Sequence, residues 1–189
     1  MSAVTAPFDS LTRTGRQDRR AERRRLKKQD RLSAQLGELH AMSALLERAA
    51  DVVGKGWVQG AWFTVATSRG PRAVTAYDLP VLNHRPVVGA CLVGSVVEAA
   101  GGPAAVRSQL VQRTLDAVGH TLREDPSEAV QWCPGPRVRV LGVLELTHWN
   151  DAPGRTQAEV VGLLEASRRT VDRQRQRCLE DQAALTPAG

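Results

Sequence analysis

Four polar side chains follow one another in the order that thiol hydrolases use. Gln59 could supply an oxyanion donor, Cys91 a nucleophile, His148 a base and Asn150 the group that orients the base. This chemistry needs a thiolate, but Cys91 lies in the apolar run GACLV, where burial raises the pKa of a thiol. We therefore interpret Cys91 as a small core residue and expect the protein not to be an enzyme. A thiol hydrolase stays open as a second alternative.

The familiar cofactor and metal motifs are incomplete. Residues 89–95 (GACLVGS) have the glycine spacing of a phosphate-binding loop but lack its lysine. Gly54 and Gly56 begin a dinucleotide fingerprint, but Gln59 stands where the third glycine is needed. No C-x-x-C, H-E-x-x-H or calcium loop occurs, and the four histidines are scattered. We expect no cofactor and no metal.

Two segments, GWVQG (56–60) and HWNDAPGRT (148–156), could form either a structural corner or a ligand site. Residues 152–155 (APGR) suit a type II turn, and Asn150 and Asp151 could accept N–H groups from a turn or a helix start. Trp149 could hold this turn against the core, and Gln59 could bond to backbone. We favour the structural corner. The alternative is a groove lined by Trp57, Gln59, Trp62, Cys91, Trp149, Asn150 and Asp151.

The positive charge is concentrated at the N-terminus. The 189 residues carry a net charge of +6, and residues 1–30, which we call the arm, hold nine Lys/Arg and four Asp/Glu. Such an asymmetry is typical of a segment that contacts a polyanion. Because no aromatic residue occurs between residues 9 and 56, phosphate contact is favoured over base stacking. We expect DNA or RNA binding, with little sequence preference, through Arg13, Arg16, Arg19, Arg20, Arg23, Arg24, Arg25, Lys27 and Lys28.

The arm has almost no apolar residues, so alone it is expected to be disordered or a fraying helix. Its cations recur mostly at steps of three and four, and a helix would place most of them along one side. A polyanion would remove their mutual repulsion, so the arm should gain helix on binding.

An alternative function is a protein–protein or assembly module, homo-oligomeric or with another partner. Apolar residues recur at helical spacing over residues 31–53, from Leu32 to Val53, and Gly54 follows as a stop. This helix could pair with a partner or with a second copy, and the arm would then only be solvated.

The other patterns predict a mainly α, compact helical domain with a small β-hairpin and a basic, partly disordered N-terminal arm. The hairpin is expected over 62–65 and 72–77, and helices over 87–100 and 103–123. Residues 78–86 and 124–136 read as loops, and 138–146 suit either a strand or a helix. Thr156 and Glu159 form a capping box that begins a last helix. We divide the chain into the arm (1–30), a helical globular domain (31–172) and a polar helix end and tail (173–189).

The composition fits a globular protein, with 42% hydrophobic and 24% charged residues. The longest stretch without a charge, residues 56–68, is shorter than the roughly 20 apolar residues of a membrane span. The three cysteines are an odd number, and the first thirty residues have no apolar core of a signal peptide. We expect a cytoplasmic protein with reduced thiols and no membrane contact.

Three segments together resemble a small uncharacterised domain family of actinobacteria and their phages. They are GWVQG, GACLVGSVVEAA and WNDAPGRTQAEVVGLLEAS, which match the patterns G-W-x-Q-G, C-x-x-G-[AS] and W-N-D. The resemblance covers about residues 40–170 and implies a compact, mostly helical cytoplasmic domain without an assigned reaction. The arm and the long loop before Cys91 depart from the pattern, so we expect any individual function to lie in the arm.

Overall fold

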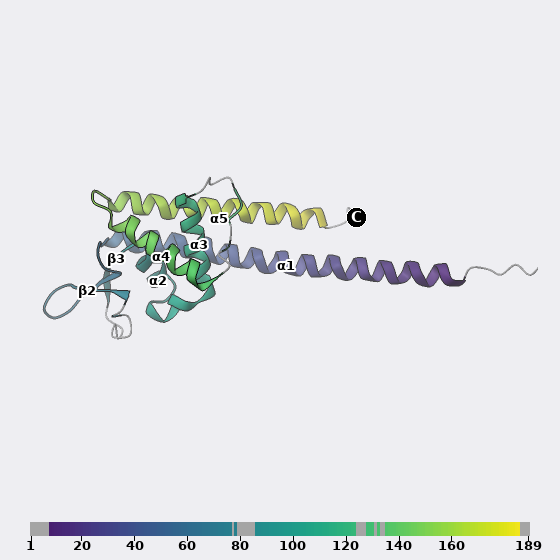
Figure 1. The fold of residues 1–189 in the computed structure, drawn as a ribbon, viewed down its shortest axis with the longest axis horizontal. Coiled ribbons are helices and arrows are strands. Elements are labelled where there is room, and N and C mark those ends of the chain that lie inside the picture. Colours follow the sequence, from purple (N-terminus) through teal and green to yellow (C-terminus); the bar gives the residue numbers. More distant parts are fainter. Residues whose placement is uncertain are drawn as a thin grey trace, which may run out of the picture. The chain divides into compact units, whose positions relative to one another are not determined.

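The computed structural model describes residues 8–76, 78, 86–123, 128–130, 132 and 135–185, with side chains from residue 18 onward. The described chain is mainly helical with a small antiparallel sheet, as the sequence predicts (Figure 1). It forms two compact units, unit 1 from residues 1–37 and 176–189, and unit 2 from residues 38–175. In order, the elements are α1 (Phe8–Lys55), β1 (Phe63–Val65), β2 (Arg72–Val74), β3 (Val87–Ala90), α2 (Leu92–Ala99), η2 (Pro103–Arg107), α3 (Gln109–Arg123), α4 (Pro136–Asp151) and α5 (Gln157–Leu185).

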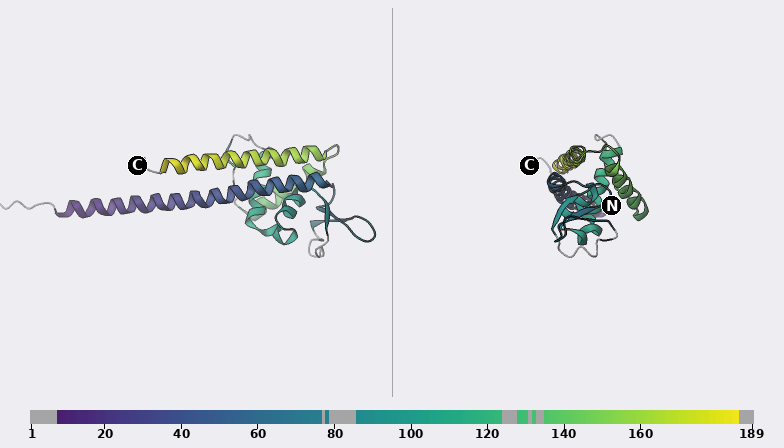
Figure 2. Two further views of the ribbon diagram at one scale, coloured as in Figure 1. Left: turned by 180° about the vertical axis from the view of Figure 1, so that it is seen from behind. Right: turned by 90° about the vertical axis from the view of Figure 1, so that its left-hand side faces the viewer.

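The core of unit 2 uses the apolar face that the sequence places on the first helix. Leu39, Met42, Leu46, Ala49 and Val53 of α1 are all buried, as expected from their helical spacing. Within the same unit, α3 packs against α4, and α2 packs against both (Figure 2).

Helices α1 and α5 run antiparallel with a regular register inside each unit. In unit 2, Arg168 pairs with Glu47 at 3.1 Å, and Arg175 lies 3.4 Å from the His40 ring. In unit 1, Gln182 donates to Ser33 at 3.1 Å. In unit 2, the seven residues from His40 to Glu47 are thus matched by seven along α5, from Arg168 to Arg175. In unit 1, three residues beyond the contact between Ser33 and Gln182, Leu185 is level with residue 30, so the arm extends past the described end of α5.

Residues 8–30 of the arm are helical, which agrees with the helical alternative of the prediction and not with a disordered segment. Helix α1 runs without a break from Phe8 to Lys55, so residue 31 is not an element boundary. Extending an existing helix costs far less than nucleating one, and Arg, Lys, Glu and Ala are good helix formers. Residues 8–30 are therefore already helical without a polyanion, and the proposed binding does not require the arm to gain helix. The side chains of Arg13 and Arg16 lie outside the described residues.

The predicted hairpin is present but belongs to a three-stranded sheet of order β2-β1-β3. Phe63 of β1 is opposite Val74 of β2 and opposite Ala90 of β3. The prediction of one helix over 87–100 was wrong for residues 87–90. The short apolar run did not distinguish strand from helix, and the backbone of this segment bonds to β1 and to the chain before it. For example, the Ala90 N–H donates to the Gly56 carbonyl at 2.9 Å.

The remaining helices refine the predictions. Residues 138–146 are helical, within α4, which has Pro136 in its first turn. The expected helix over 103–123 is divided into η2 and α3, because the Ser108 hydroxyl accepts from the Val111 N–H at 3.3 Å and caps a new helix. The last helix, α5, continues through the polar segment that begins at residue 173, as expected, and reaches Leu185. Most of the two predicted loops, residues 79–85, 124–127, 131, 133 and 134, lies outside the described residues.

Candidate functional site

The side chain of Asn150 joins three of the segments that the sequence analysis singled out. Its Oδ1 accepts from the Trp57 indole Nε1 at 2.9 Å and from the Leu92 N–H, the first of α2, at 3.0 Å. Its Nδ2 donates to the Val58 carbonyl at 3.1 Å and to Asp151 Oδ1 at 2.7 Å. Asn150 is fully buried, and its amide makes all four hydrogen bonds that an amide can make. It therefore ties the end of α4 to the start of α2 and to the GWVQG segment.

Gln59 and Asp151 close the same corner from its exposed side. The Gln59 amide donates to the carbonyls of Asn150 and Ala152 at 3.0 and 3.2 Å. Asp151 Oδ1 accepts from the Gly60 N–H at 3.0 Å. Backbone bonding by Gln59 and N–H acceptance by Asn150 and Asp151 agree with the structural interpretation of these residues.

The turn and the capping box after Asn150 are confirmed. The Arg155 N–H donates to the Ala152 carbonyl at 3.1 Å, and Gly154 has a φ of +80°, as the third position of a type II turn requires. Thr156 and Glu159 bond reciprocally, with the Thr156 N–H donating to Glu159 Oε2 at 2.8 Å. The Glu159 N–H donates to the Thr156 hydroxyl at 3.3 Å. These contacts fix where α5 begins.

Trp149 and Trp62, the other two tryptophans of the candidate groove, do not bond to the Asn150 side chain in the described structure. Trp149 is half-buried, and the Arg155 guanidinium lies 3.9 Å from its ring centroid. Trp62 is also half-buried, and its carbonyl accepts from the Cys91 N–H at 3.0 Å. The groove residues are thus connected mainly to one another and to backbone. This arrangement favours the structural corner over a ligand groove.

Cys91 caps a helix and lacks the surroundings of a nucleophile. Its Sγ accepts from the Gly94 N–H at 3.3 Å, and the residue is fully buried at the start of α2. Burial raises the pKa of the Cys91 thiol from 9.0 to about 11. His148 is exposed on α4 and makes no hydrogen bond to Cys91 in the described structure. The spacing that suggested thiol chemistry does not bring the two side chains together as a pair.

Glycine at position 94 allows α2 to lie directly against the chain before β1. A Cβ atom at Gly94 would collide with the carbonyl oxygen of Trp62. The C-x-x-G spacing in the sequence thus serves a helix cap and a close backbone approach. It does not form a phosphate loop.

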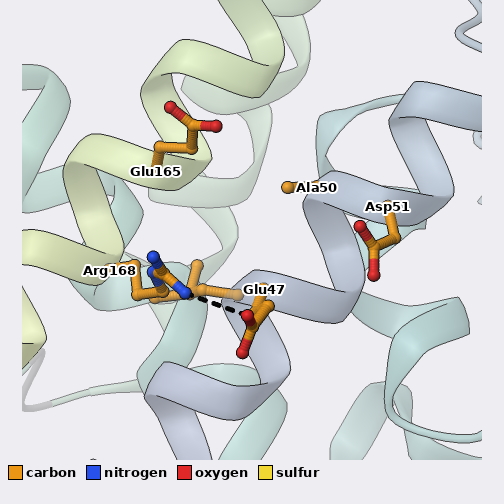
Figure 3. A pocket seen from close by; sticks show the side chains of 6 residues that line it. Glu47, Ala50, Asp51, Glu165 and Arg168 are labelled. Carbon is orange, nitrogen blue, oxygen red and sulfur yellow. Dashed lines mark ion pairs between the residues drawn. The ribbon is translucent and has the colours of Figure 1, made fainter.

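A small hollow lies between α1 and α5 within unit 2 (Figure 3). Its volume is about 190 Å³, below the roughly 300 Å³ at which small-molecule sites begin. Arg168 lies at its wall and pairs with Glu47 (Figure 3). The other lining residues are Leu46, Ala50, Asp51 and Glu165. The hollow is polar and mostly charged, and no metal-binding group of three or more His, Cys, Asp or Glu occurs among the described residues.

The arm presents a row of exposed cations. Arg19, Arg20, Arg23, Arg24, Lys27 and Lys28 are all exposed, and Arg25 is half-buried. Within residues 18–31 the described ion pair is the one between Arg25 and Glu22, at 3.0 Å. The other cations of this segment make no ion pair in the described part of the chain. Their charge is therefore not neutralised by an ion pair within the described ranges.

Four of these cations form a line along α1 that we call the cation stripe. It consists of Arg20, Arg24, Lys27 and Arg31, at steps of four, three and four residues. The sequence analysis did not include Arg31 because it lies beyond the arm, although its spacing continues the pattern. Leu32, the next residue, is buried and lies about 100° around the helix from Arg31.

Comparison with known proteins gives one family. The model of a family of unknown function, DUF6197, matches residues 38–170. No curated protein and no solved structure matches the chain. None of the helices in the described ranges is long and apolar enough to cross a bilayer. The matched region nearly coincides with unit 2 and contains the whole Asn150 corner, whereas the arm lies outside it. The chain therefore belongs to this family of unknown function, DUF6197.

Proposed function

We propose that the protein is a non-enzymatic binding module that contacts nucleic acid through its arm. The cation stripe carries this proposal, because its four exposed side chains have no ion-pair partner in the described chain. On a helix they span about 16 Å at 1.5 Å per residue. Duplex DNA carries one negative charge per roughly 1.7 Å of its axis, so several phosphates lie within reach of this row.

The chemistry of the arm favours phosphates over bases. Guanidinium and ammonium groups bond to phosphate oxygens without reading sequence. The arm lacks aromatic residues after Phe8, which single-strand binders use to stack on bases. We therefore expect binding to DNA or RNA that depends strongly on salt and little on sequence.

The family match separates the arm from the shared domain. Unit 2 holds the residues that resemble the family, and they mostly bond to one another. The arm is outside the match, which supports placing the individual function there. A cytoplasmic location and a source among actinobacteria or their phages remain predictions from the sequence.

The assembly alternative loses its original support. Most of the apolar face of residues 31–53 is buried inside the chain, although Leu36 is half-buried. The buried part of this face is therefore not available to a partner in the described structure. The thiol hydrolase alternative is weakened by the buried, helix-capping Cys91 and its raised pKa.

The proposal is tested with two variants that lose the same charge in different places. The stripe variant is R20Q/R24Q/K27Q/R31Q, and the control is K55Q/R69Q/R72Q/R107Q. The control positions are exposed cations of unit 2 without an ion pair in the described structure. Glutamine keeps the length and helix preference of the side chain. Binding to a 20-base-pair duplex is measured by fluorescence anisotropy at low salt.

We expect the stripe variant to bind at least about tenfold more weakly than the wild type, because up to four phosphate contacts are lost. The control should stay within about threefold of the wild type. Equal losses in both variants would mean that only the net charge matters. An unchanged stripe variant would refute the arm as the contact.

A further inference from the structure

The outward side of α4 carries an unusual concentration of exposed apolar side chains. Val138, Val140, Leu141 and Leu144 are 55%, 60%, 65% and 48% exposed. In the described chain the other large apolar residues of comparable exposure, Leu26, Val88 and Leu179, are spread over three other elements. Val138, Leu141 and Leu144, at steps of three residues, lie within about 120° of one another around α4, whereas Val140 lies about 160° from Val138 and outside this face. Scattered apolar residues need no explanation, but a contiguous group such as these three is typical of an interaction surface.

The same helix is also apolar on its inner side. Leu146 is 1% exposed, and α4 packs against α2 and α3. A helix that is apolar on both sides is typical of one that is covered on both sides. Helices α2 and α3 cover the inner side of α4, whereas the apolar side chains on its outer side are exposed to solvent.

The charges beside the apolar group suit a second copy of the same helix. Arg137 is exposed and makes no ion pair in the described structure. Glu145 is also exposed and pairs with Arg123 at 2.8 Å, which leaves carboxylate lone pairs for another donor. If two copies of α4 meet antiparallel about a two-fold axis at Leu141, Arg137 of one is level with Glu145 of the other. In the same arrangement Val138 is level with Leu144.

We propose that a second copy of the chain docks on the outer face of α4, defined by Val138, Leu141 and Leu144, as an antiparallel helix pair. Three apolar side chains form a small contact, so the dimer is expected to be weak and reversible. The contact does not involve the arm, and it is independent of the proposed nucleic-acid binding.

The first test is sedimentation equilibrium of the full chain without nucleic acid, from about 1 μM to about 1 mM. We expect a concentration-dependent dimer for the wild type and at least a tenfold larger dissociation constant for Leu141→Asp. The matched control is Leu179→Asp, an exposed leucine on α5, which should dimerise like the wild type. Circular dichroism checks that both variants keep their helix. A monomeric wild type, or equal dimerisation of both variants, would overturn the proposal.

The second test uses charge exchange to identify the register. Arg137→Glu alone sets glutamate against Glu145 of the partner, and Glu145→Arg alone sets arginine against Arg137. Each single variant should therefore dimerise more weakly than the wild type. An equimolar mixture restores both opposite-charge pairs, so it should form more dimer than either variant alone. A mixture that behaves as the average of its components would exclude this register.

Discussion

At the residue scale, the central side chain is Asn150. It bonds to Trp57, Val58, Asp151 and the first N–H of α2 while fully buried. Asn150→Leu would leave the Trp57 indole, the Leu92 N–H and the Val58 carbonyl without these partners. Because each buried unsatisfied group costs about 1–3 kcal/mol, we expect a loss of about 3–5 kcal/mol in the free energy of unfolding. Urea unfolding monitored by circular dichroism measures it.

Asp151→Asn is the matched control for this change. Its remaining Oδ1 can still accept from the Gly60 N–H and from the Asn150 amide. We expect a loss of less than about 1 kcal/mol. If Asn150→Leu were as mild as Asp151→Asn, the corner would not hold the fold, and a ligand site would become the better interpretation.

Cys91 gives a second prediction at this scale. Thiolates react with iodoacetamide, and raising a pKa from 9.0 to about 11 lowers the thiolate fraction at pH 7.5 by about 100-fold. Together with full burial, this should leave Cys91 unmodified in the folded protein while it reacts in urea. Peptide mass mapping after alkylation distinguishes the two states. Rapid modification of Cys91 in the native protein would support the thiol hydrolase alternative.

At the element scale, the features that depend on local sequence were predictable. The last helix, its capping box and its preceding turn followed from Thr156, Glu159 and Gly154, because these signals act within a few residues. The buried face of α1 followed from the 3.6-residue period of its leucines.

The features that depend on distant pairing were not predictable. Residues 87–90 are apolar and short, and only their pairing with β1 makes them a strand. The sequence suggested that Asn150 accepts backbone N–H groups, but it did not identify which ones. Apart from the neighbouring Asp151, the partners of Asn150 lie 58 to 93 residues away in the chain. For the arm, the sequence left disorder and a fraying helix open, because it was considered in isolation from the helix that follows.

At the scale of the whole molecule, the protein separates a family domain from a charged extension. Unit 2 contains the matched region and the Asn150 corner, and the arm belongs to unit 1. In the α1–α5 register, the arm lies beyond Leu185 of α5. Removing residues 1–30 should therefore leave the melting temperature nearly unchanged.

The most direct test of the nucleic-acid proposal compares the full chain with a chain lacking residues 1–30 on one duplex over a range of salt concentrations. Contact with about five phosphates predicts a slope of log K against log salt of about −4 to −5 for the full chain. We expect the truncated chain to bind too weakly to measure at low salt while melting at the same temperature. Equal affinities for the two chains, or no binding by either, would contradict the account.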